Sequence, residues 1–227
     1  MKVDQPPQGT TAPQNACDTA RPIVAIVDDE ASVREALSEL IELAGLQTVS
    51  FGSTRELLDS DVVSSPGCLI LDVRMPGDSG LDLQQHLTKA GNMKPVIFLT
   101  GHGDIPMSVQ AMKAGAVDFL TKPVRDKALL EAVRKAISLD AARRADAAIV
   151  KGITERHETL TPREREVLQG VTRGRLNKQI AFDLGIREVT VKLHRGNVMR
   201  KMDVTSLSEL IRVCDRLPTF VREDPKT

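Results

Sequence analysis

The chain has 227 residues and equal numbers of basic and acidic side chains, so its formal net charge is zero. Its length suits two small domains, and a hydrophobic content of 41% is enough to build their cores. The apolar runs are strand-sized, far below the roughly 20 residues that a membrane span needs, and residues 1–20 lack the apolar segment of a signal peptide. We therefore expect a cytoplasmic protein without a membrane partner.

The cysteines and the charge distribution refine this expectation. Cys17, Cys68 and Cys214 are too widely spaced for a disulfide framework or a zinc site, which predicts free thiols in a reducing compartment. Residues 21–144 carry 14 basic and 17 acidic side chains, whereas residues 159–217 carry 12 basic and 7 acidic ones. The basic second half indicates contact with a polyanion, although so small an excess is also compatible with an ordinary protein surface.

Residues 1–20 are rich in Pro, Gln, Thr and Ala and are predicted to form a disordered tail. After them, short apolar segments alternate with amphipathic ones. Strands are predicted at Ile23–Val27, Thr48–Phe51, Cys68–Leu71, Val96–Leu99 and Val117–Leu120. Helices are predicted at Ala31–Ala44, from Ser53 with Glu56 as a capping box, and at Leu81–Ala90, Ile105–Ala114 and Arg125–Leu139. Continuously apolar strands predict an α/β domain over residues 21–140, with a five-stranded parallel sheet covered on both faces.

Residues 141–158 lack a strong apolar stripe and are predicted to be a linker, which we expect to be helical because Ala and Arg favour helix. Residues 159–217 are predicted to be all α-helical. Thr161, Pro162 and Glu164 together supply an N-cap, an N1 proline and a capping box. Further helices are predicted at Lys178–Leu184 with Asn177 as N-cap, at Glu188–Met202 and at Ser206–Val213. Four short helices with Gly185 in a tight turn predict a helix-turn-helix domain, followed by a tail over residues 218–227.

Polar side chains stand at the ends of the predicted strands. Asp28 and Asp29 follow the first strand and Asp72 follows the third. Because the carboxyl ends of neighbouring parallel strands meet at one edge of a sheet, these carboxylates should converge and attract a hard divalent cation. Thr100 and Lys122 follow the fourth and fifth strands. A hydroxyl, an ammonium and a magnesium site beside a carboxylate suit phosphoryl transfer onto that carboxylate, although each residue alone could be a solvated surface group.

Four motifs in order carry these residues: Ile26-Val27-Asp28-Asp29-Glu30, Leu71-Asp72-Val73-Arg74-Met75-Pro76-Gly77, Leu99-Thr100-Gly101-His102-Gly103-Asp104 and Phe119-Leu120-Thr121-Lys122-Pro123. They closely resemble receiver domains of the FixJ-type subfamily of two-component response regulators. The resemblance covers about residues 21–143 and implies a flavodoxin-like fold and a sensor histidine kinase as partner. It implies Asp72 as phosphoacceptor, Mg²⁺ bound by Asp28, Asp29, Asp72 and the Arg74 carbonyl, Lys122 as phosphate partner, and a cis peptide before Pro123.

The resemblance also implies Thr100 and Phe119 as switch residues. A hydroxyl can turn to accept a new phosphoryl group, and a nearby ring can move into the space that it leaves. Plain core packing is the alternative for Phe119. The sequence departs from the pattern at Asp78, where receivers of this type usually carry an apolar residue, and this adds negative charge near the site.

Helix Glu188–Met202 holds the candidates for nucleic-acid contact. Lys192 and Arg195 lie near one face with His194 and Asn197 beside them, opposite an apolar stripe. Cationic side chains contact phosphates, and Arg, Asn and His can read base edges. A solvated basic face is the alternative. An aromatic content of 2% disfavours stacking on single strands and is compatible with duplex binding.

The motifs Leu160-Thr161-Pro162-Arg163-Glu164-Arg165-Glu166-Val167-Leu168, Asn177-Lys178-Gln179-Ile180-Ala181 and Thr190-Val191-Lys192-Leu193-His194-Arg195 resemble the LuxR/NarL-type helix-turn-helix. The resemblance runs over about residues 160–213 and implies that Glu188–Met202 is the recognition helix. It places Lys178, Thr190, Lys192, Arg195 and Asn197 at or near duplex DNA. Arg187 replaces the usual capping Ser or Thr, and Gly196 replaces a side chain that contacts DNA in some relatives.

Together these features predict a phosphorylation-controlled transcription regulator, most simply an activator, rather than an enzyme by main function. Phosphorylation of Asp72 would cause the face made by the fourth helix and fifth strand to dimerise or to release the DNA-binding domain. A homodimer would then bind paired half-sites in promoter DNA and contact RNA polymerase. Two alternatives remain open at this point. One is a DNA-binding regulator that is independent of phosphorylation and has a structural receiver, and the other is a freestanding phosphoryl-transfer enzyme.

Overall fold

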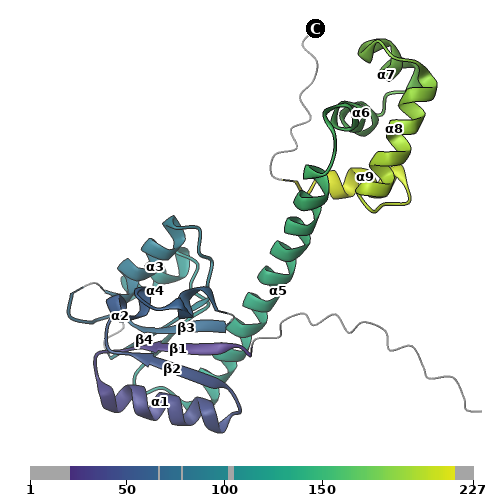
Figure 1. Ribbon diagram of the computed structural model, residues 1–227. Helices are drawn as coiled ribbons and strands as arrows, with labels where there is room; N and C mark the ends of the chain where they lie inside the picture. Colours follow the sequence, from purple (N-terminus) through teal and green to yellow (C-terminus); the bar gives the residue numbers. More distant parts are fainter. Residues whose placement is uncertain (1–20, 66, 78, 102–104, 218–227) are drawn as a thin grey trace, which may run out of the picture. The chain divides into compact units, whose positions relative to one another are not determined.

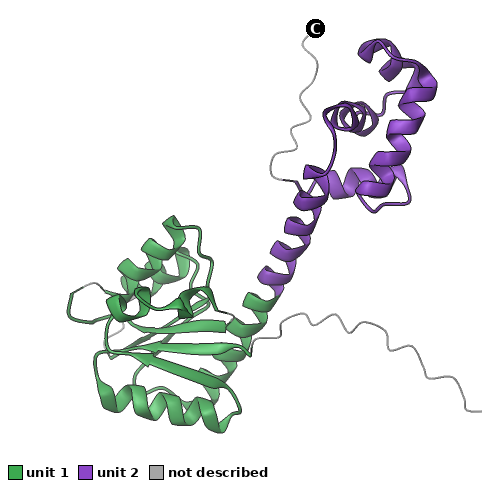
Figure 2. Ribbon diagram, viewed as in Figure 1, with its two compact units in different colours: residues 1–141 green, residues 142–227 purple. Residues whose placement is uncertain are grey.

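The computed structural model describes residues 21–65, 67–77, 79–101 and 105–217. It divides into two compact units, residues 1–141 and 142–227 (Figure 2). The two predicted tails lie outside the described residues. So do five of the positions named in the sequence: Cys17, Asp78, His102, Gly103 and Asp104.

A five-stranded parallel sheet forms the centre of the first unit, as the sequence predicts (Figure 1). Its strands are β1 (Ile23–Val27), β2 (Gln47–Phe51), β3 (Gly67–Asp72), β4 (Val96–Thr100) and β5 (Asp118–Thr121). Their order is β2-β1-β3-β4-β5, and every neighbouring pair is parallel. Because β1 lies beside β3 and Val27 is aligned with Leu71, the residues that follow these two strands emerge side by side.

Helices cover both faces of this sheet. The helices α1 (Ala31–Leu43) and α5 (Asp126–Glu158) pack on one face, and α2 (Thr54–Leu58), α3 (Gly80–Lys89) and α4 (Ile105–Lys113) pack on the other. A short 3₁₀ helix, Asp61–Ser64, was not predicted. Every residue of β3 and β4 is buried, which explains why these strands are apolar without alternation.

Helix α5 extends over 33 residues, because the predicted helix Arg125–Leu139 continues through the segment 141–158 that was expected to be helical. Its first part contributes Leu129 and Val133 to the core on the sheet, whereas Ile153 belongs to the core of the second unit. The segment predicted to be a linker is therefore helical, and its last turns are part of the second unit. None of the helices in the described ranges, α5 included, combines the length and apolar character of a membrane span.

The second unit contains the four further helices that the sequence predicts: α6 (Pro162–Thr172), α7 (Asn177–Leu184), α8 (Glu188–Lys201) and α9 (Leu207–Cys214). The capping box at the start of α6 is confirmed, since Thr161 and Glu164 exchange hydrogen bonds. Asn177 as N-cap was wrong: Leu176 occupies that position, and its amide donates to the side chain of Gln179 at 2.8 Å. Arg187 supplies no side-chain cap to α8, as predicted.

A part-buried ion pair joins the start of α6 to the end of α8. Glu164 is 4% exposed and lies 2.7 Å from the Nζ of Lys201. Burial alone would raise the pKa of Glu164, but hydrogen bonds from Lys201 and Thr161 outweigh it, so the pKa lies below its ordinary value. This pair fixes α8 against α6 and thereby orients the predicted recognition helix.

Candidate functional site

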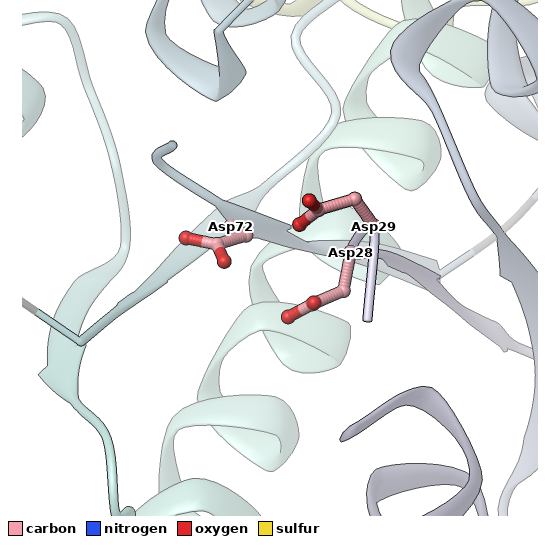
Figure 3. A group of neighbouring side chains, drawn as sticks. All are labelled: Asp28, Asp29 and Asp72. Carbon is pink, nitrogen blue, oxygen red and sulfur yellow. The ribbon is translucent and has the colours of Figure 1, made fainter. Parts of the chain in front are cut away.

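Three carboxylates meet where β1 and β3 end (Figure 3). Asp28, Asp29 and Asp72 each offer an oxygen, and these three oxygens lie within 4.8 Å of one another. Asp28 is 1% exposed and Asp72 is 8% exposed, whereas Asp29 is open to solvent. The convergence that the strand order predicts is therefore present.

Lys122 bridges two of these carboxylates. Its Nζ donates to Oδ2 of Asp28 at 2.5 Å and to Oδ2 of Asp72 at 2.8 Å. Burial alone would lower the pKa of this ammonium, but the hydrogen bonds and charges of Asp28 and Asp72 outweigh it and raise the pKa above its ordinary value. Lys122 therefore stays positively charged at physiological pH. The peptide that follows it, to Pro123, is cis, as the resemblance implies.

Backbone amides orient the same carboxylates. Oδ1 of Asp28 accepts a hydrogen bond from the amide of Glu30 at 3.0 Å, and Oδ1 of Asp72 accepts one from the amide of Arg74 at 3.1 Å. Each aspartate is thus held at both oxygens, by a backbone amide on one and by Lys122 on the other. Arg74 lies in the turn after β3, at the same edge of the sheet.

The two predicted switch residues lie on the next strands of the sheet. Thr100 ends β4 with no exposed surface, one residue beyond Leu99, which is aligned with Asp72. Phe119 in β5 is half-buried, and its ring centroid lies 6.3 Å from that of the fully buried Phe98. Phe119 thus packs against the core on one side and keeps exposed surface.

Two residues that shape this edge were not predicted from the sequence. A Cβ on Gly80 would lie 2.3 Å from the carbonyl oxygen of Asp72, so only glycine lets α3 begin so close to the strand end. The signal for it was a glycine directly after Ser79, which caps α3. Arg34 in α1 is the second, because its Nη1 donates to the carbonyl oxygen of Asp28 at 2.7 Å.

The donor set of this edge fits a divalent cation. Carboxylate oxygens are the ligands that Mg²⁺ prefers, and the mutual spacing of the three oxygens allows one ion to contact each of Asp28, Asp29 and Asp72. Like charges so close together also need a cation to offset their repulsion, a role that Lys122 fills for Asp28 and Asp72.

In the second unit, the candidates for DNA contact lie on α7 and α8. Lys178 and Lys192 are exposed, whereas Thr190, His194, Arg195 and Asn197 are half-buried. The structure holds several of them by local hydrogen bonds: Nη1 of Arg195 donates to Asn177 Oδ1 at 3.3 Å, and Asn197 Oδ1 accepts from Arg200 at 3.2 Å. Nδ1 of His194 is buried without a hydrogen-bond partner among the described residues, so this atom faces the interior.

The core-facing stripe of α8 is as predicted, since Val191, Val198 and Met202 are buried. Val189 and Leu193 are each 64% exposed on this helix, and the sequence pattern did not predict them as contact residues. Apolar side chains at a recognition helix can contact the methyl group of thymine. The exposed face of α8 therefore offers apolar as well as cationic contacts.

Comparison with known families gives a match for each unit. Residues 24–134 match the response regulator receiver domain, and residues 158–214 match the luxR family of bacterial regulatory proteins. Among similar proteins, the response regulator protein TodT of Pseudomonas putida is 51% identical over 195 residues, 86% of each chain. Nodulation protein W of Bradyrhizobium diazoefficiens is 49% identical over 199 residues, 88% of each chain. The transcriptional regulatory protein FixJ of Azorhizobium caulinodans is 45% identical, over 84% of this chain and 90% of its own.

Solved structures agree with these matches. The response regulator StyR is 46% identical and superimposes with a TM-score of 0.79 over 87% of this chain and 100% of its own. Full-length FixJ from B. japonicum is 39% identical, with a TM-score of 0.53 over 87% of this chain and 98% of its own. The chain belongs to the two-component response regulators that regulate transcription, with a receiver domain followed by a LuxR-type DNA-binding domain.

Proposed function

We propose that Asp72 accepts a phosphoryl group from the histidine of a sensor kinase. An oxygen of Asp72 attacks phosphorus, the P–N bond to the imidazole breaks, and its electron pair returns to the nitrogen. Lys122 supports this role, because it is positively charged and already touches Asp72. It can transfer its hydrogen bond from the carboxylate to a phosphoryl oxygen.

Asp28, Asp29 and Asp72, with the backbone carbonyl of Arg74, would hold Mg²⁺. When bound, the ion offsets negative charge on the phosphoryl oxygens. Asp28 and Asp29 would keep the positive charge of the ion beside Asp72. The hydrogen bond from the amide of Glu30 keeps the carboxylate of Asp28 directed to the site.

Thr100 and Phe119 would convert the phosphorylation of Asp72 into a rearrangement of the domain surface. The Thr100 hydroxyl turns to the phosphoryl group, and the ring of Phe119 moves inward, which alters the face made by α4 and β5. The burial of Thr100 beside the strand end of Asp72 and the remaining exposure of Phe119 support this sequence of events. The altered face then forms a homodimer.

The dimer would bind paired half-sites in double-stranded promoter DNA, with α8 in the major groove. Lys178 and Lys192 are available for phosphates, and Thr190, His194, Arg195 and Asn197 are candidates for further DNA contacts. Contact with RNA polymerase would then activate transcription. Because promoter DNA is the target, we place the protein in the bacterial cytoplasm.

One observation carries this proposal: oxygens of Asp28, Asp29 and Asp72 converge to within 4.8 Å of one another, and Lys122 contacts two of these carboxylates. A receiver that served only as a structural support would not need three converging carboxylates, which cost stability by repulsion. The alternative of a freestanding enzyme is set aside, since the relatives are transcriptional regulators.

The test compares the wild-type protein with Asp72→Asn in the presence of Mg²⁺ and acetyl phosphate. We expect only the wild type to shift to a dimer in light scattering and to bind promoter DNA more tightly at a fixed salt concentration. Equal size and equal DNA affinity of the two phosphoryl-donor-treated proteins would reject the proposal in favour of a receiver with a structural role.

A further inference from the structure

Arg34 reaches back from α1 to the strand end that carries the acidic cluster. Its Nη1 donates to the backbone carbonyl oxygen of Asp28 at 2.7 Å, across six residues of chain, and the side chain is half-buried. This carbonyl lies one residue beyond Val27, the last residue of β1 aligned with β2 and β3. Outside the sheet, the direction of the backbone depends on local contacts such as this one.

The contact completes a set of four hydrogen bonds at Asp28. Its amide donates to the carbonyl of Phe51 at 3.2 Å, and its two carboxylate oxygens accept from the amide of Glu30 and from Lys122. Only two of these partners are side chains. Lys122 is shared with Asp72 and is proposed to turn to the phosphoryl group, so Arg34 is the side chain whose hold on Asp28 persists.

The peptide whose oxygen Arg34 holds is the one that joins Asp28 to Asp29. A change of ψ at Asp28 would swing this peptide and displace Asp29, which would separate the carboxylate of Asp29 from those of Asp28 and Asp72. We propose that Arg34 is a positioning residue of the cation site, which fixes this peptide and keeps Asp28 and Asp29 in the arrangement that binds Mg²⁺. The inference rests on the proposed function, since Mg²⁺ is the cation assigned there.

The charge of Arg34 would act in the opposite direction. A guanidinium near the cluster repels a cation, so loss of its charge alone would tighten Mg²⁺ binding. A positioning role predicts weaker Mg²⁺ binding when Arg34 is replaced, whereas charge repulsion alone predicts tighter binding. An experiment can therefore separate the two effects.

The experiment measures Mg²⁺ binding to the full-length protein by titration calorimetry. Arg34→Met should weaken binding on the order of tenfold, as is typical when a residue that orients a metal ligand is lost. Arg34→Lys should recover part of this loss, because an ammonium can donate to the same carbonyl. Arg55→Met is the matched control: Arg55 is an exposed arginine of α2, and its removal should leave binding unchanged.

A second measurement follows the phosphorylation of Asp72 by acetyl phosphate as a function of Mg²⁺. Arg34→Met should raise the half-saturating Mg²⁺ concentration by the same factor, and leave the rate at saturation within about twofold of the wild type, because the loss is in binding. Mg²⁺ binding that is unchanged or tighter in a folded Arg34→Met protein would overturn the positioning role. If the wild type binds Mg²⁺ but Asp72 is not phosphorylated, the proposed function fails and the positioning role stands; absence of Mg²⁺ binding by the wild type would reject both.

Discussion

At the scale of single residues, the receiver domain depends on charges placed where water cannot fully screen them. Asp28 and Asp72 are buried, and Lys122 contacts both. Removing one partner of such a group leaves the others with an uncompensated charge, and this costs more than the pair itself contributes. The same reasoning applies to Glu164 and Lys201 in the DNA-binding domain.

Lys122→Met should lower the unfolding free energy by about 1–3 kcal/mol in a buffer without divalent cations, because Asp28 and Asp72 then repel each other without compensation. Added Mg²⁺ should restore more stability to this variant than to the wild type. Thermal unfolding with and without Mg²⁺ measures the difference. Lys127→Met removes a lysine whose side chain is 89% exposed and serves as control. An equal response to Mg²⁺ in the two variants would contradict the prediction.

Glu164 should make stability depend on pH in the acidic range. Its pKa is lowered in the folded state, so its contribution is complete above the unfolded pKa, about 4.3, and is lost as the pH falls through the folded value. Glu164→Gln should therefore be less stable than the wild type at pH 7 by about 1–3 kcal/mol, with a gap that narrows below about pH 4.

Chemical denaturation at several pH values tests this expectation. Glu166→Gln is the control, because Glu166 forms an exposed pair with Arg163 in the same helix. A gap between Glu164→Gln and the wild type that stays constant down to pH 3 would show that the carboxylate charge is not the source of the stability.

At the scale of elements, two helices of the DNA-binding domain contain a glycine, and the two glycines have opposite effects on stability. Gly196 lies within α8, and a Cβ there would meet no heavy atom within 4 Å. Gly170 lies in α6, and a Cβ there would stand 2.8 Å from Cγ1 of Ile180, which is buried in the core of this domain. The first glycine only weakens its helix, whereas the second allows α6 and α7 to pack.

Gly196→Ala should therefore stabilise the DNA-binding domain by about 0.5–1 kcal/mol, the usual difference between the two residues in a helix. Gly170→Ala should destabilise it by about 1–3 kcal/mol, because the added methyl group overpacks a buried contact. Calorimetric unfolding of the two variants beside the wild type decides the matter. Changes of the same sign in both variants would contradict the assignment.

At the scale of the whole molecule, the two domains are joined by one continuous helix. Residues 129–139 of α5 contribute to the core on the receiver sheet, and Ile153 packs in the DNA-binding domain. Between these two parts, the side chains of residues 144–149 are all exposed. Helical stability in proteins comes mainly from tertiary packing of an apolar face, so this stretch should be the weakest part of α5.

Hydrogen exchange of the full-length protein tests this expectation. Amides of residues 144–149 should exchange faster than those of residues 129–137 in the same helix, by about one to two orders of magnitude, because opening there breaks few buried contacts. The core amides of α6 are a second reference. Equal protection along α5 would show that the middle of the helix is covered by a partner, such as a second copy of the chain.

The sequence by itself determined the fold class and the acidic site, because both follow from periodicity. Apolar runs of strand length between amphipathic segments specify a parallel sheet, and residues at the carboxyl ends of its neighbouring strands must share one edge. The positions of Asp28, Asp29, Asp72 and Lys122 followed from this rule and from the motifs. The capping box of Thr161 and Glu164 could also be predicted from the sequence, since it depends only on two residues three positions apart.

Only the tertiary structure decided which residues make contacts that helix or strand periodicity does not predict. The bond from Arg34 to the carbonyl of Asp28 is one, and the close approach of Gly80 to Asp72 is another. The packing of the last turns of α5 is a third, since these turns are held by a core that forms from later parts of the chain. Local propensity fixes which elements form, whereas side-chain reach and packing distance depend on how these elements are placed in space.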